Sequence, residues 1–119
     1  MYGIPKPNIK PDGHWFQNVY DWVVSKVGVV TVTDDYTITV SDFYVRADAT
    51  SGALTVTLPA ALNKTGREVI IKKIDSGANA VTIGITGSDT IEGSSSMSLA
   101  SQWDKQRLIS NGNASWEKI

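Results

Sequence analysis

The chain of 119 residues contains no cysteine, a single histidine and only four prolines. Without cysteine it can form no disulfide framework, no thiolate metal site and no cysteine nucleophile. The lone His14 cannot supply a two-histidine metal centre. Eleven basic residues against twelve acidic ones leave a net charge of −1, whereas a dedicated nucleic-acid binder normally carries a basic face or tail. We therefore expect no thiol chemistry and no nucleic-acid partner.

Long hydrophobic runs are also missing. The longest apolar stretch, around Val27–Val30, falls far short of the ~20 residues that a bilayer span requires. Residues Met1–Pro11 carry three prolines and no apolar core of the kind found in signal peptides. The sequence therefore predicts a soluble protein that is not exported by the usual route and has no membrane partner.

β-Branched residues are abundant instead. Valine, isoleucine and threonine, at 12, 11 and 11 copies, make up more than a quarter of the chain, and such side chains favour pleated strands over helices. From Val29 onward, apolar residues alternate with threonine at a period of two. The expected strands are 29–33, 36–40, 43–47, 54–58, 68–74, 81–86, a short 89–91 segment within the Gly/Ser-rich stretch 87–98, and a final hairpin of 106–110 and 115–119.

Seven or more short strands at roughly ten-residue spacing predict a small β-sandwich or a jelly-roll-like domain. The turn of that last hairpin is Asn111–Ala114, because Asn-Gly readily supplies a positive φ. Lys72 and Lys73 indicate that the strand 68–74 has an exposed face or lies at an edge. No internal repeat of fixed length is evident.

The first 28 residues differ in composition from the rest and hold half of the aromatic residues. Ile4–Pro11 is expected to be a proline-rich extended arm. Asp12 is a candidate N-cap for one short amphipathic helix that ends near Gly28. The helix either caps the core of its own domain or docks, with the arm, onto another subunit or a larger particle. The candidate docking and oligomerisation residues are Ile4, Pro5, Pro7, Trp15, Phe16, Val19, Tyr20, Trp22 and Val23.

The chain thus divides into an N-terminal arm and helix, 1–28, and a β domain, 29–119. Candidate catalytic groups are weak: His14 has no evident partner carboxylate, and the acidic residues adjoin Gly, Ser or Thr, as turn residues do. We expect no catalytic residue, no cofactor and no metal site. A calcium site from Asp34, Asp35 and Asp42 is less favoured than a solvated turn, because the EF-hand spacing is absent.

Two further groups of side chains have a binding interpretation. Trp103 and Trp116 are candidate glycan contacts, since exposed indole rings stack on sugars, although the alternation around Trp116 favours a core or rim position. Basic residues recur in the second half of the chain, but Glu68, Asp75 and Asp104 are interspersed with them. The sequence therefore predicts a mixed, solvated surface for the basic residues Arg67, Lys72, Lys73 and Arg107.

The order of motifs from residue 29 to 119 resembles a β-rich module of tailed-bacteriophage virion proteins. The matching pieces are Asp35–Ile38, Ala49–Ala61, Gly66–Arg67, Ile70–Asn79, Val81–Ile83, Gly87–Gly93, Leu108–Gly112 and Trp116. Such modules occur in tail fibres, in baseplate or tail-tip proteins and in head fibres or decoration proteins, typically as homotrimers. The resemblance carries over no catalytic residues.

The resemblance implies a structural protein of the virion, assembled in the host cytoplasm. With no long shaft before the module, this chain suits a short fibre, an adaptor or a decoration protein, attached to capsid or tail proteins through its N-terminal segment. Two alternatives stay open. One is a module that binds a glycan of the host surface, and the other, less favoured, is a small glycan-cleaving enzyme that uses Asp89 and Glu92.

Overall fold

A computed structural model of the chain describes residues 28–119. The expected arm and helix, and with them all the candidate docking residues between Ile4 and Val23, lie outside the described residues. Within 28–119 no helix has the length and apolar character needed to cross a membrane.

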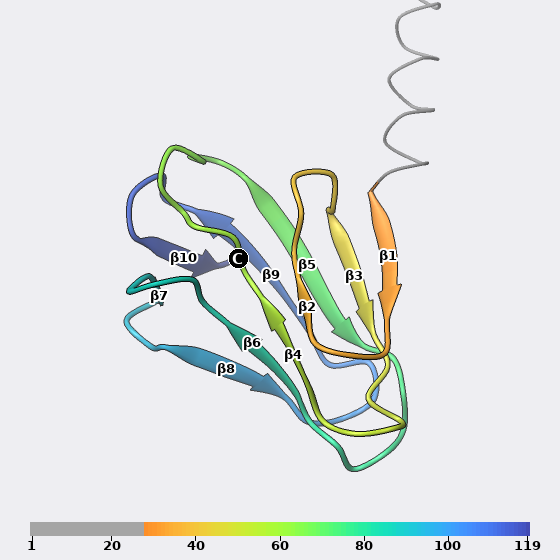
Figure 1. The fold of residues 1–119 in the computed structure, drawn as a ribbon. Helices are drawn as coiled ribbons and strands as arrows, with labels where there is room; N and C mark the ends of the chain where they lie inside the picture. Colours follow the sequence, from red (N-terminus) through yellow and green to blue (C-terminus); the bar gives the residue numbers. More distant parts are fainter. Residues whose placement is uncertain (1–27) are drawn as a thin grey trace, which may run out of the picture.

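The described part of the chain is all-β, as predicted, with ten short strands in two facing sheets (Figure 1). The six-stranded sheet has the order β1 (Val29–Val32), β3 (Tyr44–Ala47), β5 (Glu68–Lys73), β9 (Lys105–Ser110), β10 (Ser115–Lys118) and β7 (Thr90–Ile91). The four-stranded sheet has the order β2 (Tyr36–Thr37), β4 (Leu54–Thr57), β6 (Val81–Gly84) and β8 (Ser96–Leu99).

The first six strands alternate between the two sheets, so the chain winds as a flattened coil of three turns. Strands β1, β3 and β5 pair in parallel in one sheet, and β2, β4 and β6 pair in parallel in the other. Val45 thereby lies between Val30 and Ile71 in register. This parallel pairing distinguishes the sandwich from a jelly roll, whose sheets are antiparallel.

Antiparallel strands complete both sheets. β8 pairs with β6, and β9 pairs with β5 and then turns back as the hairpin β9–β10. The predicted turn at Asn111 is confirmed: Gly112 has a φ of +84°, and Asn111 Oδ1 accepts hydrogen bonds from the backbone N–H groups of Asn113 and Ser115. The short segment at 89–91 is a strand as well, whereas β8 was not predicted, because its stretch reads as a serine-rich loop.

The core lies between the sheets and is built by strict alternation along the strands. Trp116, on β10, is the largest fully buried side chain, and its Nε1 donates to the carbonyl of Pro59 at 3.0 Å. Lys73 is also fully buried, and β5 lies between β3 and β9. Of the two interpretations of the lysine pair, the edge strand is therefore wrong, because β5 is a central strand, whereas the outward-facing position holds for Lys72 but not for the buried Lys73.

Candidate functional site

The outer face of the six-stranded sheet gathers side chains from four neighbouring strands. Because Val69, Ile71 and Lys73 point into the core, Ile70 and Lys72 of β5 point outward. The strand register then fixes their neighbours on this face. One row across the sheet is Val29, Tyr44, Ile70 and Arg107, and the next row is Thr31, Arg46, Lys72 and Lys105.

The second row brings three cations together, and we call Arg46, Lys72 and Lys105 the basic row. Arg46 lies directly opposite Lys72 across a parallel pair, and Lys72 lies opposite Lys105 across an antiparallel pair. At about 4.8 Å between strands, the row spans about 10 Å. Like charges placed directly opposite each other in a sheet are destabilising. Arg46 Nη1 donates to Thr31 Oγ1 at 2.9 Å.

A groove adjoins the basic row on the same face. It has a volume of about 380 Å³ and is lined by Val29, Phe43, Tyr44, Ile70, Lys72, Lys105 and Arg107. Apolar and aromatic side chains thus line the groove beside three cations. Arg107 is bonded to Glu68 by its Nε, at 2.8 Å from Oε1, and by its Nη2.

Trp103 lies in the turn between β8 and β9, beside Lys72, the middle cation of the basic row. Its backbone has a φ of +72°, a conformation that bulky residues rarely adopt, and its N–H donates to the carbonyl of Lys73 at 2.8 Å. The side chain is 56% exposed, with the Lys72 ammonium 5.3 Å from the ring centroid. Of the two tryptophans considered as glycan contacts, only Trp103 presents its ring to solvent, because Trp116 is buried.

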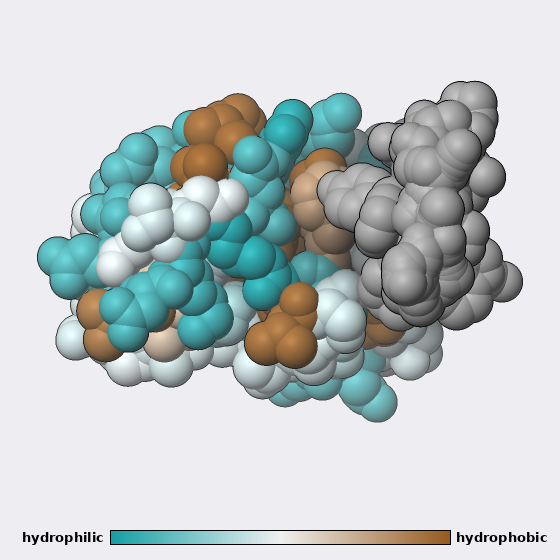
Figure 2. Space-filling view, turned by 90° about the horizontal axis from the view of Figure 1, so that it is seen from above, coloured by the Kyte–Doolittle hydropathy of each residue, from teal (hydrophilic) through white to brown (hydrophobic). Residues whose placement is uncertain are grey.

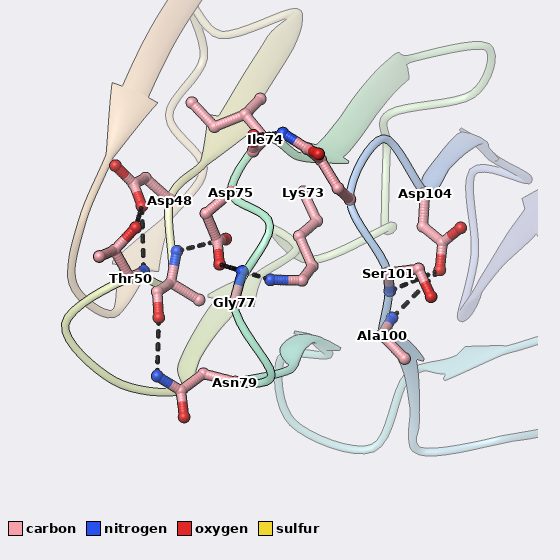
Figure 3. A network of polar contacts seen from close by, with 12 residues as sticks. Asp48, Thr50, Lys73, Ile74, Asp75, Gly77, Asn79, Ala100, Ser101 and Asp104 are labelled. Atoms are coloured by element: carbon pink, nitrogen blue, oxygen red, sulfur yellow. Dashed lines mark hydrogen bonds and ion pairs between the residues drawn. The ribbon is translucent and has the colours of Figure 1, made fainter.

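A second polar cluster lies where the chain passes from one sheet to the other, and it is shown in Figure 3. Lys73 Nζ contacts Asp75 Oδ2 at 2.7 Å. The same carboxylate accepts hydrogen bonds from the N–H groups of Ala49 at 2.8 Å and Gly77 at 3.0 Å, and Asn79 Nδ2 donates to the Ala49 carbonyl at 2.9 Å. The hydrogen bond from Lys73 is the main cause that lowers the pKa of Asp75 to about 2. This cluster ties three segments of chain together.

The acidic residues considered for catalysis or calcium do not form one cluster, and Asp35, Asp42, Asp89 and Glu92 each hydrogen-bond the surrounding chain. Asp42 Oδ2 accepts from the Tyr36 hydroxyl at 2.6 Å, and Asp35 Oδ1 accepts from the Thr55 N–H at 2.8 Å. Asp89 bonds the Ala61 N–H and Glu92 bonds the Lys118 N–H, each at 2.9 Å. No group of three or more His, Asp or Glu residues that could hold a metal ion occurs between residues 28 and 119.

The four basic residues named from the sequence do not share one surface. Lys73 is inside the core, and Arg67 donates to the carbonyls of Thr39 and Asp42 at the opposite end of β5. Only Lys72 and Arg107 face the groove. Sequence reasoning missed Arg46 and Lys105 as their neighbours, because only the pairing register of β3, β5 and β9 places them there.

Comparisons with known proteins leave the chain without an assigned relative. No protein-family model matches it, and no curated protein is significantly similar to it in sequence.

Proposed function

We propose that the protein is a structural component of a tailed-phage virion, a short trimeric fibre, adaptor or decoration protein attached through its N-terminal segment. The ordered resemblance between residues 29 and 119 suggests this class of protein. The dispersed acidic groups support it, since each of them that contacts the fold holds backbone or a neighbouring side chain rather than facing a shared cleft.

The observation that carries the proposal is the open first turn of the coil. Within the described residues β1 pairs only with β3, and β2 pairs only with β4, so each is the edge of its sheet. Unpaired strand edges are sites at which further chains add. This turn follows directly on the segment 1–28: the Gly28 carbonyl accepts from the N–H groups of Phe43 and Tyr44 at 2.8 and 2.7 Å.

Exposed apolar side chains accompany the open turn. Val29 is 56% exposed, Phe43 43% and Val40 87%. Figure 2, which is seen from above the view of Figure 1, shows exposed apolar side chains as separate groups among hydrophilic ones. An interface formed here would therefore mix apolar and polar contacts, as many subunit interfaces do. Homotrimer formation would cover the open edges and these side chains together.

Native mass spectrometry of the full chain tests the association. We expect a species of about 39 kDa, three times the 12.9 kDa of one chain. Val29→Glu should shift the population towards the monomer, because it places a charge at the open turn. Leu62→Glu is the matched control, since Leu62 is 57% exposed in the loop between β4 and β5. A monomer at all concentrations, or equal effects of the two substitutions, would contradict the proposal.

A further inference from the structure

We propose that the outer face of the six-stranded sheet binds an acidic polysaccharide, with the basic row contacting its carboxylates and Trp103 stacking on a sugar ring. This binding site does not rest on the virion assignment, because its evidence is the charged and aromatic side chains of the sheet face. Val29 and Phe43, which line its groove, also belong to the open turn of the coil.

Positive charge is concentrated at one end of this face, which favours an anionic ligand there. Arg46, Lys72 and Lys105 lie in register on adjacent strands, so they repel one another in the free protein. The acidic residues of the face, Glu68 and Glu117, flank Ile109 in register at the other end. A ligand with regularly spaced negative charges would relieve the repulsion along the basic row.

Aromatic and apolar side chains beside the cations suit a sugar. Tyr44, Phe43 and Ile70 line the groove next to Lys72 and Lys105. Trp103, beside Lys72, is held in a positive-φ conformation with more than half of its surface exposed. An indole offers one flat apolar face to the C–H groups of a sugar ring, while the neighbouring cations bind its carboxylate.

An acidic glycan fits these observations better than a polynucleotide does. The chain has a net charge of −1, whereas proteins that follow a polyphosphate backbone carry a continuous basic surface. Here the basic row covers only about 10 Å at the usual strand spacing, and the path across the face then meets Glu68 and Glu117. The site is therefore sized for a few charged sugars.

Biolayer interferometry with the full chain tests this proposal, with polygalacturonate as the probe in calcium-free buffer. Fully methyl-esterified polygalacturonate has the same sugar without the charge, and polyglutamate has charge without the sugar. An oligothymidylate tests for a nucleic-acid site. We expect binding to polygalacturonate that weakens as salt is added, and weaker binding to the three other polymers.

Matched variants assign the binding to this face. In K72Q/K105Q two cations of the basic row are lost, and since one exposed ion pair contributes up to about fivefold, the affinity should fall roughly five- to twentyfold. K64Q/K118Q removes the same amount of charge away from this face. Lys64 lies in the loop after β4. Lys118 is paired in register with Leu108, whose side chain points into the core, so Lys118 does not belong to the outer face. This control should keep its affinity, and Trp103→Ala should lose affinity for polygalacturonate but not for polyglutamate.

A stability readout separates a ligand site from a structural role for the row. Lys105→Gln removes a like-charge neighbour of Lys72, so at low salt the free variant should melt at a higher temperature than the wild type while binding polygalacturonate more weakly. The proposal is overturned if polygalacturonate does not bind, if polyglutamate or oligothymidylate binds as tightly, or if the two double variants lose affinity equally.

Discussion

At the residue scale, the fold depends on buried polar groups that hold the crossings between the two sheets. Lys73 would be a costly residue in a core if its ammonium were unpaired. Asp75 pairs with it, and the remaining carboxylate capacity is filled by backbone N–H groups. The sequence Lys-Lys-Ile-Asp at 72–75 shows the charged residues but not that the two lysines have different environments. Lys72 lines the groove, whereas Lys73 is buried and pairs with Asp75 in the loop after β5.

This pair predicts a specific dependence of stability on pH. The pKa of Asp75 is lowered from 3.8 to about 2 in the folded protein, so its contribution to stability is complete above about pH 4 and is lost as the pH falls through about 2. Asp75→Asn should destabilise the protein at neutral pH and should reduce the loss of stability that occurs as the pH falls from about 4 to about 2. The exposed Asp34→Asn is the control, and thermal melts from pH 7 to 2 are the measurement. If the melting temperature of Asp75→Asn falls at acid pH as much as that of the wild type, Asp75 is not the group responsible.

The double variant Lys73→Met/Asp75→Asn checks the cause of that loss. If Asp75→Asn destabilises by leaving a buried ammonium without its partner, removing the ammonium as well should recover part of the stability. Urea unfolding at pH 7 measures this recovery. A double variant less stable than Asp75→Asn alone would show that Lys73 stabilises through contacts other than the ion pair.

Gly112 is a position where both conformation and space require glycine. Its φ is +84°, and an added Cβ would lie 1.8 Å from Thr65 Oγ1 and 2.9 Å from Thr65 Cβ. Gly112→Ala should therefore cost more than the strain of about 1–3 kcal/mol that such backbone conformations carry. Gly87→Ala is the control, because Gly87 has a φ of +61° with open space around its Cβ position. Equal losses in urea unfolding would exclude the contact with Thr65.

At the scale of elements, the sequence predicts which residues alternate along a strand, but not which strands pair with each other. Apart from β8, the strand positions, the final hairpin and the inward set of Leu54, Val56 and Leu58 follow from period-two patterning. The coil does not, because its turns differ in length. Fifteen residues separate Val29 from its partner Tyr44, but twenty-six separate Tyr44 from Ile70, so no fixed repeat marks the sequence.

The candidate site, too, could be predicted only in part from the sequence. Trp103 could be named from its residue type, and the basic residues on β5 and β9 could be seen in the sequence. Their grouping into the basic row depends on a register that brings Arg46 beside Lys72 and Lys72 beside Lys105. Long-range pairing of this kind is set by the packing of the whole core and leaves no local signal.

Neighbouring isoleucines on β5 test the two faces of the sheet. Ile71 is fully buried in the core, whereas Ile70 lines the groove on the outer face. Ile71→Ala should cost about 2–5 kcal/mol of unfolding free energy, and Ile70→Ala should cost about 1 kcal/mol or less because less apolar surface is at stake. Urea unfolding measures both. A larger loss for Ile70→Ala would mean that the outer face is covered in solution.

At the scale of the whole molecule, the described region is a three-turn β coil whose sheets are extended on one side by further strands. Beyond β5 and β6 these strands end at the sheet edges β7 and β8, whereas β1 and β2 are the two edges that lie beside the exposed apolar residues Val29, Val40 and Phe43. The two proposed sites adjoin at Val29 and Phe43, with attachment and trimer formation at the open turn and glycan binding along the basic row of the outer sheet face.

Quantitative mass spectrometry of gradient-purified particles, from a lysate in which the chain is expressed, decides whether the protein is part of a phage particle. Peptides of the chain should co-purify with the particles, in a copy number that is a multiple of three. A chain that is abundant in the lysate and absent from the purified particles would contradict it.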